Sequence, residues 1–283
     1  MIASSPTSAQ LGSHSVRYAL RAPRGEATGT PLVLLHGGAV DHRMWEPQLE
    51  AFPDRLVLAP DARGHGGTSD AEEAYRLTDD VVELLDALGV GRAVLVGVSM
   101  GGGIAVDTAL EHPDRVAGLV VSGTGTSEPD FADSWTLETL AAWRRAEEQA
   151  DLEGWIAAFL RFTHGPGRDR AEVDPQVWDL VETMARETLA GHLRVGADGI
   201  PLPPVPPTPV TETWERAAGI SVPVLALPGA LDGEDHRRLG RRLAEVVPDA
   251  DHEEVPGGAH YPNLENPAGF NAAVTGFLRR HDL

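Results

Sequence analysis

The sequence Gly97-Val98-Ser99-Met100-Gly101 lies between an apolar run, residues 93–96, and a segment of helical composition, residues 102–110. A serine on a sharp turn between a strand and a helix presents an exposed hydroxyl, while its neighbours press against the adjoining backbone. Glycine at both ends of the pentapeptide removes the Cβ atoms that would clash there. The stretch predicts strand, turn and helix, with Ser99 as a candidate nucleophile. A glycine-rich turn with an incidental serine can have the same sequence, so the choice between the two interpretations depends on the surrounding residues.

Attack of a serine on a carbonyl group creates a negatively charged oxygen, the oxyanion, which needs hydrogen-bond donors. Such donors are expected in the loop after an earlier strand. The apolar run 32–35 reads as a buried strand and opens into His36-Gly37-Gly38-Ala39, where a carbonyl oxygen can approach backbone N–H groups. We expect the N–H of Gly38, or alternatively that of Ala39, to act with the N–H of Met100. His36 is then an orienting group beneath the loop. A plain tight turn is the alternative.

An acid that orients a catalytic base is expected after a later strand. Residues 222–227 form an apolar run that leads to Asp232, which is our candidate acid. Asp235 is the second choice, and a merely solvated loop aspartate is the alternative for both. Asp61 also follows a strand-like run, but it precedes the serine, so the chain order argues against it.

The candidate base is His260, one of eleven histidines, in the turn-rich loop 256–262 before the closing helix. His252 lies about one strand length away and is expected at the surface. Serine, acid and histidine thus follow one another in the order typical of a Ser–Asp–His hydrolase.

Five ordered motifs carry a resemblance to the α/β-hydrolase superfamily. They are Leu35-His36-Gly37-Gly38, Asp61-Ala62-Arg63-Gly64-His65-Gly66, the pentapeptide around Ser99, residues 229–232 and residues 258–260. Arg43-Met44-Trp45 with Pro47-Gln48-Leu49 also resembles the branch of enol-lactonases and small esterases. The resemblance implies a mostly parallel eight-stranded sheet flanked by helices, with an inserted helical cap. It gives Asp61 and Arg63 a structural role, and Ser99, where some relatives have aspartate, disfavours epoxide opening and dehalogenation.

Composition agrees with one catalytic domain that carries an insert. The chain has 283 residues, 42% of them hydrophobic, no cysteine and a formal net charge of −20. This charge disfavours nucleic acid and anionic membrane surfaces as partners, and the absence of cysteine excludes disulfides and thiolate chemistry. We expect no cofactor and no metal, because the histidines lack metal-binding spacing. No apolar stretch is long enough for a membrane span or signal peptide, so cytoplasm is the expected location.

Residues 128–209 interrupt the alternation of strands and helices. Helical patterns at 137–150, 152–162 and 175–189 predict a cap, with residues 1–126 and 213–283 as the two parts of the core and 127–212 as the cap. Six prolines between 201 and 209 predict an extended return to the core. Candidates for the pocket lining are His36, Ala39, Trp135, Trp143, Trp155, His164 and Tyr261. For each tryptophan, packing within the cap is the alternative to lining the pocket. His164 and Arg168 lie in a turn where both could meet a carboxylate or carbonyl group of the substrate, and a plain surface loop is the alternative.

The prediction is a cofactor-free serine hydrolase that cleaves an ester or lactone of a small to medium hydrophobic substrate. Carbon–carbon bond hydrolysis of a diketone-like compound and perhydrolysis use the same triad and stay open. A ligand-binding, receptor-like protein of this fold is the alternative outside enzymes. The oligomeric state, a homo-oligomer included, is not indicated by the sequence.

Overall fold

A computed structural model describes residues 7–12, 14–196 and 201–283, and its centre is an eight-stranded sheet. The order of the strands is β1-β2-β4-β3-β5-β6-β9-β10; the pairs β1–β2 and β2–β4 are antiparallel, and the other pairs are parallel. The strands of this sheet are β1 (Thr7–Leu11), β2 (His14–Arg21), β3 (Leu32–Leu35), β4 (Val57–Pro60), β5 (Ala93–Val98), β6 (Val116–Ser122), β9 (Val224–Ala226) and β10 (Ala250–His252). The predicted mostly parallel eight-stranded sheet is confirmed.

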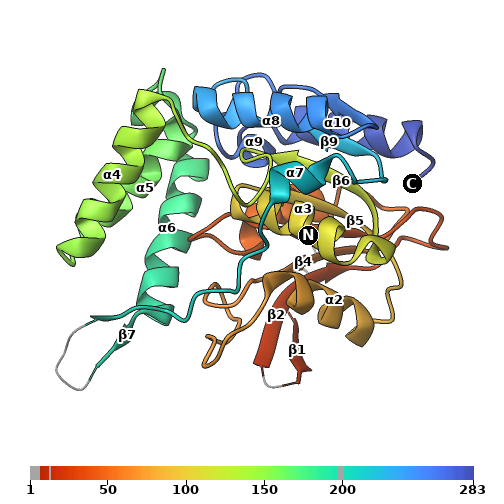
Figure 1. Cartoon of the computed structure of the whole chain (residues 1–283), viewed down its shortest axis with the longest axis horizontal. Coiled ribbons are helices and arrows are strands. Elements are labelled where there is room, and N and C mark those ends of the chain that lie inside the picture. The colour runs from red at the N-terminus through yellow and green to blue at the C-terminus, as the bar shows by residue number, and fades with distance from the viewer. Residues whose placement is uncertain (1–6, 13, 197–200) are drawn as a thin grey trace.

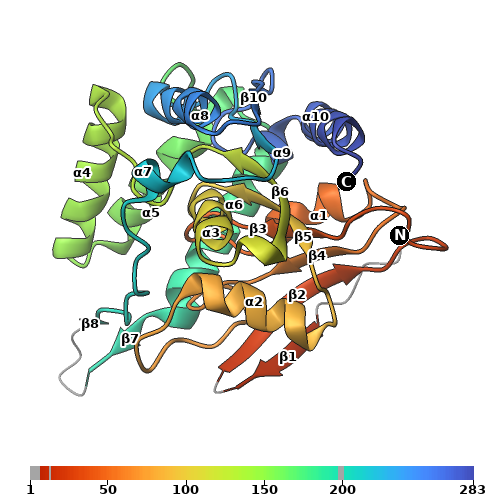
Figure 2. The ribbon, with the colours of Figure 1, turned by 45° about the vertical axis from the view of Figure 1, so that its right-hand side comes forward.

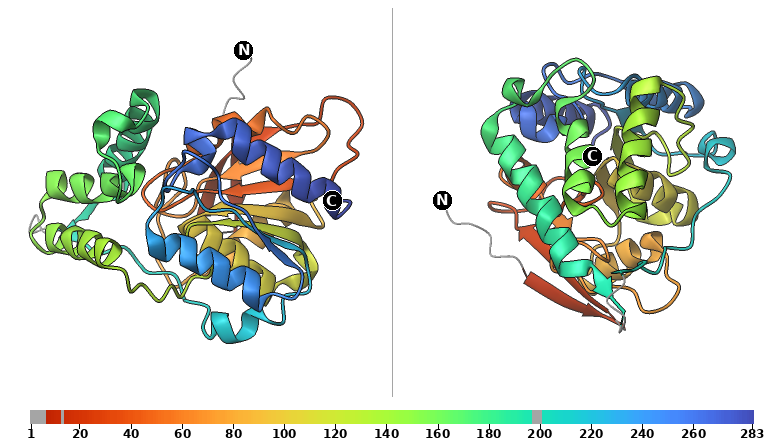
Figure 3. Two further views of the ribbon diagram at one scale, coloured as in Figure 1. Left: turned by 90° about the horizontal axis from the view of Figure 1, so that it is seen from above. Right: turned by 90° about the vertical axis from the view of Figure 1, so that its left-hand side faces the viewer.

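Helices cover both faces of this sheet, as Figures 1 and 2 show. One face carries α2 (Leu77–Ala87), α3 (Met100–Glu111), α7 (Thr213–Ala217) and α8 (Glu234–Val246). The other face carries η1 (His42–Trp45), α1 (Glu46–Leu49), α9 (Pro262–Glu265) and α10 (Pro267–Arg280). A short turn, η2 (Pro113–Arg115), precedes β6. The view from above separates the two helical layers (Figure 3).

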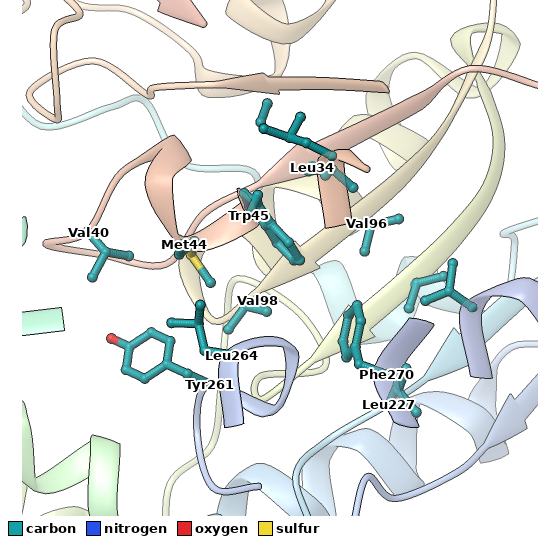
Figure 4. Packing of buried hydrophobic residues seen from close by; sticks show 14 of the residues in the cluster. Leu34, Val40, Met44, Trp45, Val96, Val98, Leu227, Tyr261, Leu264 and Phe270 are labelled. Carbon is teal, nitrogen blue, oxygen red and sulfur yellow. The ribbon is translucent and has the colours of Figure 1, made fainter. Parts of the chain in front are cut away.

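Alternation along the strands explains why both faces are apolar. Leu32 and Leu34 of β3 point into the core beneath α10, whereas Val33 and Leu35 point into the core beneath α3. Figure 4 shows the first of these cores, where Trp45 packs among Leu34, Val96 and Phe270. The Trp45 and Phe270 rings lie 6.0 Å apart. Burial of both faces is what a parallel sheet requires.

The insert between β6 and β9 is helical. It contains α4 (Ser134–Glu148), α5 (Leu152–His164), η3 (Arg170–Glu172) and α6 (Pro175–His192), and a two-stranded ribbon, β7 (Arg194–Val195) and β8 (Pro201–Leu202). We call α4, α5 and α6 the cap helices; they stand to the left of the sheet in Figure 1. Residues 203–210 return to the core without helix or strand. The exact division at residues 126/127 and 212/213 stays a prediction.

Two strands differ from the prediction. β1 was not foreseen because it is a half-exposed edge strand, and the last strand, β10, ends at His252 rather than beginning there. Only an isolated parallel bridge, between Gly229 and Val255, continues towards the loop of His260. The expectation that the chain has no signal peptide concerns the first residues, and residues 1–6 and 13 lie outside the described part of the chain. Across the described part of the chain, no helix has the length and apolar character needed to cross a bilayer.

Candidate active site

The turn at Ser99 has the strained geometry that the pentapeptide predicts. Ser99 adopts φ +54° and ψ −118° directly between β5 and α3. Its N–H donates to the carbonyl of Ser122 on β6 at 2.8 Å. A Cβ on Gly97 would lie 2.1 Å from the carbonyl oxygen of Gly101, and one on Gly101 would lie 2.0 Å from that of Leu35. Only glycine permits this approach of helix and sheet, which holds the serine in a conformation that non-glycine residues rarely adopt.

The loop after β3 orients backbone N–H groups towards the same place. The Nε2 of buried His36 accepts the N–H of Ala62 at 2.9 Å, so its proton lies on Nδ1, which donates to the carbonyl of Gly37 at 2.7 Å. Burial lowers the pKa of His36, in keeping with the neutral ring. Because C=O and N–H of a trans peptide point in opposite directions, the N–H of Gly38 is turned away from His36. Both Gly38 and Met100, the first residue of α3, line the cavity described below.

Asp232 and His260 meet through a buried hydrogen bond. Asp232 follows β9 and His260 precedes α9, and Nδ1 of His260 donates to Oδ2 of Asp232 at 2.9 Å. Both side chains are at most 5% exposed. Burial alone favours a neutral acid, but the two neighbouring imidazoles outweigh it and lower the pKa of Asp232 well below its ordinary value. Asp232 is therefore a carboxylate that fixes the tautomer of His260, with the proton on Nδ1 and a lone pair on Nε2.

Ser99 and His260 line one cavity. A Cβ on Gly123, which has φ +88°, would lie 3.0 Å from His260 Cε1 and 3.7 Å from the nitrogen of Ser99, so the two residues flank this glycine. Within the described residues no hydrogen bond joins the Ser99 hydroxyl to His260. Such bonds are commonly long before a substrate is bound.

A second histidine, His236, binds the same carboxylate. Its Nδ1 donates to Oδ1 of Asp232 at 3.0 Å, and its ring centroid lies 4.5 Å from that of His260. Although burial opposes it, the charge of Asp232 raises the pKa of His236. The sequence analysis missed this residue; its position four residues after Asp232, in the first turn of α8, was the available signal.

Asp232, His236 and His260 together have the donor types of a metal site, with ligand atoms within 4.8 Å of one another. The Nδ1–Oδ distances of 2.9 and 3.0 Å are those of hydrogen bonds in which each imidazole donates. Direct contact between these atoms satisfies the carboxylate without an ion.

The cavity between core and cap has a volume of about 460 Å³. Its floor is formed by α3, its roof by the cap helices α4 and α5 and one wall by residues 207–210. The apolar part of the roof consists of Leu140, Trp143, Phe159 and Phe162. The size of this cavity is within the range of small-molecule sites, and its lining combines apolar side chains with polar ones.

Trp143 and Tyr261 line this cavity, but five of the pocket candidates do not. Trp155 stacks on Phe159, and Trp135 meets Phe162 edge to face. His164 stacks on Trp178, while its Nδ1 contacts the carbonyl of Gly165. Ala39 is buried with φ +61°, and His36 lies under the oxyanion loop. Aromatic side chains of the cap thus pack mainly on one another, which periodicity alone does not distinguish from lining a pocket.

The alternative acids and base have other partners. Asp235 accepts the N–H groups of Ala132 and Asp133 at 2.5 and 2.7 Å and so holds the start of the cap. Asp61 accepts the N–H groups of His42 and Gly67, a structural role. His252 ends β10 beside α8 and is half-buried rather than fully exposed.

Arg168 is buried in an ion pair rather than free to meet a ligand. It contacts Glu265 at 2.7 Å, with 12% and 5% of the two side chains exposed. Glu265 in turn accepts the N–H of Ala259, next to His260. The loop 164–168 therefore joins the cap to the loop of the candidate base.

Comparison with known proteins agrees with this geometry. The family profile described as alpha/beta hydrolase fold matches residues 30–267. The chain belongs to the α/β-hydrolase family. This α/β-hydrolase is 31% identical over 265 residues to the "Putative carbamate hydrolase RutD" of a Caulobacter species, which covers 90% of the chain and 92% of that protein. It is 28% identical to 3-oxoadipate enol-lactonase 2 of Acinetobacter baylyi, over 90% of the chain and 91% of that protein.

A solved structure has a similar fold over most of the chain. The enol-lactonase from Burkholderia xenovorans has a TM-score of 0.73 and 26% identity, with 96% of this chain and 100% of that chain covered. Family, relatives and fold together identify the protein as an α/β-hydrolase enzyme. The resemblance inferred from the five motifs is confirmed.

Proposed function

We propose that this enzyme is a serine hydrolase that cleaves a carboxylic ester or lactone of a small to medium hydrophobic substrate through an acyl-enzyme. The observation that carries the proposal is the buried Asp232–His260 hydrogen bond, whose imidazole shares a cavity with Ser99. A hydroxyl nucleophile, an oriented base and backbone donors are the three parts that acyl transfer needs.

The first half of the reaction forms the acyl-enzyme. Nε2 of His260 takes the proton of the Ser99 hydroxyl as its oxygen bonds to the substrate carbonyl carbon. The N–H groups of Gly38 and Met100 stabilise the negative charge on the carbonyl oxygen. His260 then passes its proton to the leaving alkoxide, and the bond between carbon and leaving oxygen breaks.

The second half releases the acid. His260 takes a proton from water, the hydroxide attacks the acyl carbon, and collapse of the second tetrahedral intermediate returns the proton to Ser99. Asp232 stays ionised and stabilises the imidazolium in both halves. The apolar roof excludes water from the acyl chain and strengthens the oxyanion contacts.

The test is covalent labelling by a fluorophosphonate, followed by hydrolysis of p-nitrophenyl esters of rising chain length. We expect one label, mapped to the peptide with Ser99, and turnover that peaks at one chain length. Ser99→Ala should lose label and turnover while keeping the wild-type circular dichroism; Ser134→Ala, an exposed serine outside the cavity, should keep both.

A label on wild type without ester or lactone turnover would overturn the substrate class and favour carbon–carbon bond hydrolysis. Absence of any label would overturn the nucleophile and favour a ligand-binding protein. Turnover with peracid formation from hydrogen peroxide would instead support perhydrolysis.

A further inference from the structure

The cavity contains a buried carboxyl group that the proposed reaction does not use. Asp107 lies on α3, eight residues after Ser99, lines the cavity and is 8% exposed. Within the described residues the only hydrogen bond of its side chain is from the hydroxyl of Ser127, at 2.8 Å to Oδ1. Among those residues its Oδ2 has no hydrogen-bond donor.

No arginine or lysine lines the described part of this cavity, so no cation of the protein balances Asp107 there. Arg216, the nearest arginine that affects Asp107, is paired with Glu111 at 2.5 Å. Glu128, a second acid in the lining, is bound by the N–H and hydroxyl of Thr213. A buried carboxylate without a cation is costly, and a positively charged group of a ligand removes that cost.

The helix sets the distance between the reacting end and the acidic end. A rise of about 1.5 Å per residue over eight residues separates Ser99 and Asp107 by roughly 12 Å. Gly103, halfway between them on α3, also lines the cavity, and a Cβ there would lie 3.1 Å from Cα of Ser127, the residue that binds Asp107. Ile104, Phe159 and Val210 are among the apolar residues of the same lining.

We propose that Asp107 forms a subsite for a protonated amine at the far end of the substrate's acyl chain. The inference rests on the proposed function and adds a substrate class to it: esters or lactones of aliphatic amino acids whose amine lies about eight carbons from the carbonyl, the length that the helix allows. Substrates with a carboxylate at that end are disfavoured by the same group. Burial raises the pKa of Asp107 to about 6, so the preference for amines grows as the pH rises through this value.

The test compares three p-nitrophenyl esters of one chain length: octanoate, octanoate with a terminal amine, and the corresponding half-ester of the dicarboxylic acid. At pH 8 we expect the amine ester to exceed the dicarboxylate half-ester in kcat/KM by about tenfold or more, in line with one charge-assisted contact. Asp107→Asn should bring that ratio towards one, and the exposed control Asp114→Asn should keep it.

The two failures are distinguishable. If octanoate is not cleaved in a Ser99-dependent way, the proposed function fails. If octanoate is cleaved but neither the ratio nor its response to Asp107→Asn is observed, the amine subsite is refuted and the hydrolase stands. Inhibition of wild type by octylamine and by the uncharged 1-octanol needs no variant: octylamine inhibition at pH 8 that is no stronger than that by octanol would also overturn the subsite.

A second inference rests on a separate observation, the pairing of two imidazoles with one carboxylate. We infer that His236 is a positioning residue that shares Asp232 with His260. Gly233 N–H and His236 Nδ1 occupy Oδ1, so only Oδ2 remains for His260, and the carboxylate cannot rotate without losing these bonds.

Protonation of His236 also alters the charge beside His260. The titratable groups around His236 are Asp232 and His260 from core loops, Asp235 from its own helix and Asp133 before α4; Phe131 and Phe162 complete its surroundings. Three acids favour an imidazolium at His236. An imidazolium at His236 then lies with its centroid 4.5 Å from that of the ring that takes up the proton in the proposed reaction, and like charges at this separation repel.

The readout is the acid limb of the pH profile of kcat/KM, which a purely structural role would not move. In His236→Gln we expect this limb to move to higher pH, because the positive charge beside the imidazole of the proposed base is lost. His252→Gln, outside the cavity, should leave it in place. A lower plateau with an unmoved limb would refute the inference. Should the variant fail to fold, an NMR titration of wild type decides, because a His236 that stays neutral below pH 5 is equally contradictory.

Discussion

Gly101 connects the stability of the fold to the geometry of the candidate oxyanion hole. A Cβ at this position would lie 2.0 Å from the carbonyl oxygen of Leu35, 2.4 Å from its carbon and 2.7 Å from the carbonyl oxygen of His36. All three atoms are backbone atoms, so no side chain can move aside. In Gly101→Ala, the end of β3 and the start of α3 must therefore separate by about 1.4 Å to bring the 2.0 Å approach to an ordinary contact of 3.4 Å.

We expect two measurable effects of this substitution. Overpacking against fixed backbone should lower the free energy of unfolding by about 3 kcal/mol, and Tm by about 6–12 °C for a chain of this size. The N–H of Met100 would move relative to that of Gly38 by a similar distance, which should lower kcat/KM by about 100-fold. Urea unfolding and p-nitrophenyl ester hydrolysis measure the two quantities.

Gly276→Ala is the matched control. Gly276 lies within α10 at an exposed position, and a Cβ there would meet nothing within 4 Å. The free energy of unfolding of this variant should rise by about 0.5–1 kcal/mol, since alanine is the better helix former, and its activity should stay at the wild-type level. Wild-type stability and turnover in Gly101→Ala would refute the reasoning, because the turn at Ser99 would then accommodate a Cβ for which the structure has no space.

Three further predictions concern the acid, the roof and the junction with the cap. Asp232→Asn should lower kcat by about 10³–10⁴-fold with the fold intact, because the imidazole loses its anionic partner; circular dichroism and steady-state kinetics check this. Trp143→Ala should move the optimum of the ester series to longer acyl chains, whereas Trp155→Ala should lower Tm and leave the optimum unchanged. Arg168→Met should lower the free energy of unfolding at pH 7 by about 3–5 kcal/mol, because Glu265 is left as a buried charge without its ion-pair partner. Burial raises the pKa of Glu265 and loss of Arg168 raises it further, so this cost should shrink in unfolding measured at pH 4.5.

Local rules made much of this protein readable from its sequence. The turn at Ser99 needs glycine at positions 97 and 101 because backbone atoms lie within 2.1 Å of the places that their Cβ atoms would take. Both glycines can be read directly from the sequence. The apolar runs of β3, β5 and β6 are buried on both faces, so they needed no partner to be recognised as strands. β1 was not predicted and β10 was misplaced, because a short, half-exposed strand has neither a continuous apolar run nor a clear alternation of apolar and polar residues.

Chain order and local motif chemistry thus determined the family, the parallel sheet and the choice of Ser99, Asp232 and His260 as candidates. Only the tertiary structure decided that His236 shares the carboxylate, that Asp107 faces the cavity and that Trp143 lines it while Trp155 does not. The physical reason is that backbone strain and strand burial depend on residues next to one another in the chain. The contents of a cavity depend instead on how α3, α8 and the cap helices are set against each other, through contacts up to about a hundred residues apart, such as those of Asp235 with the start of the cap.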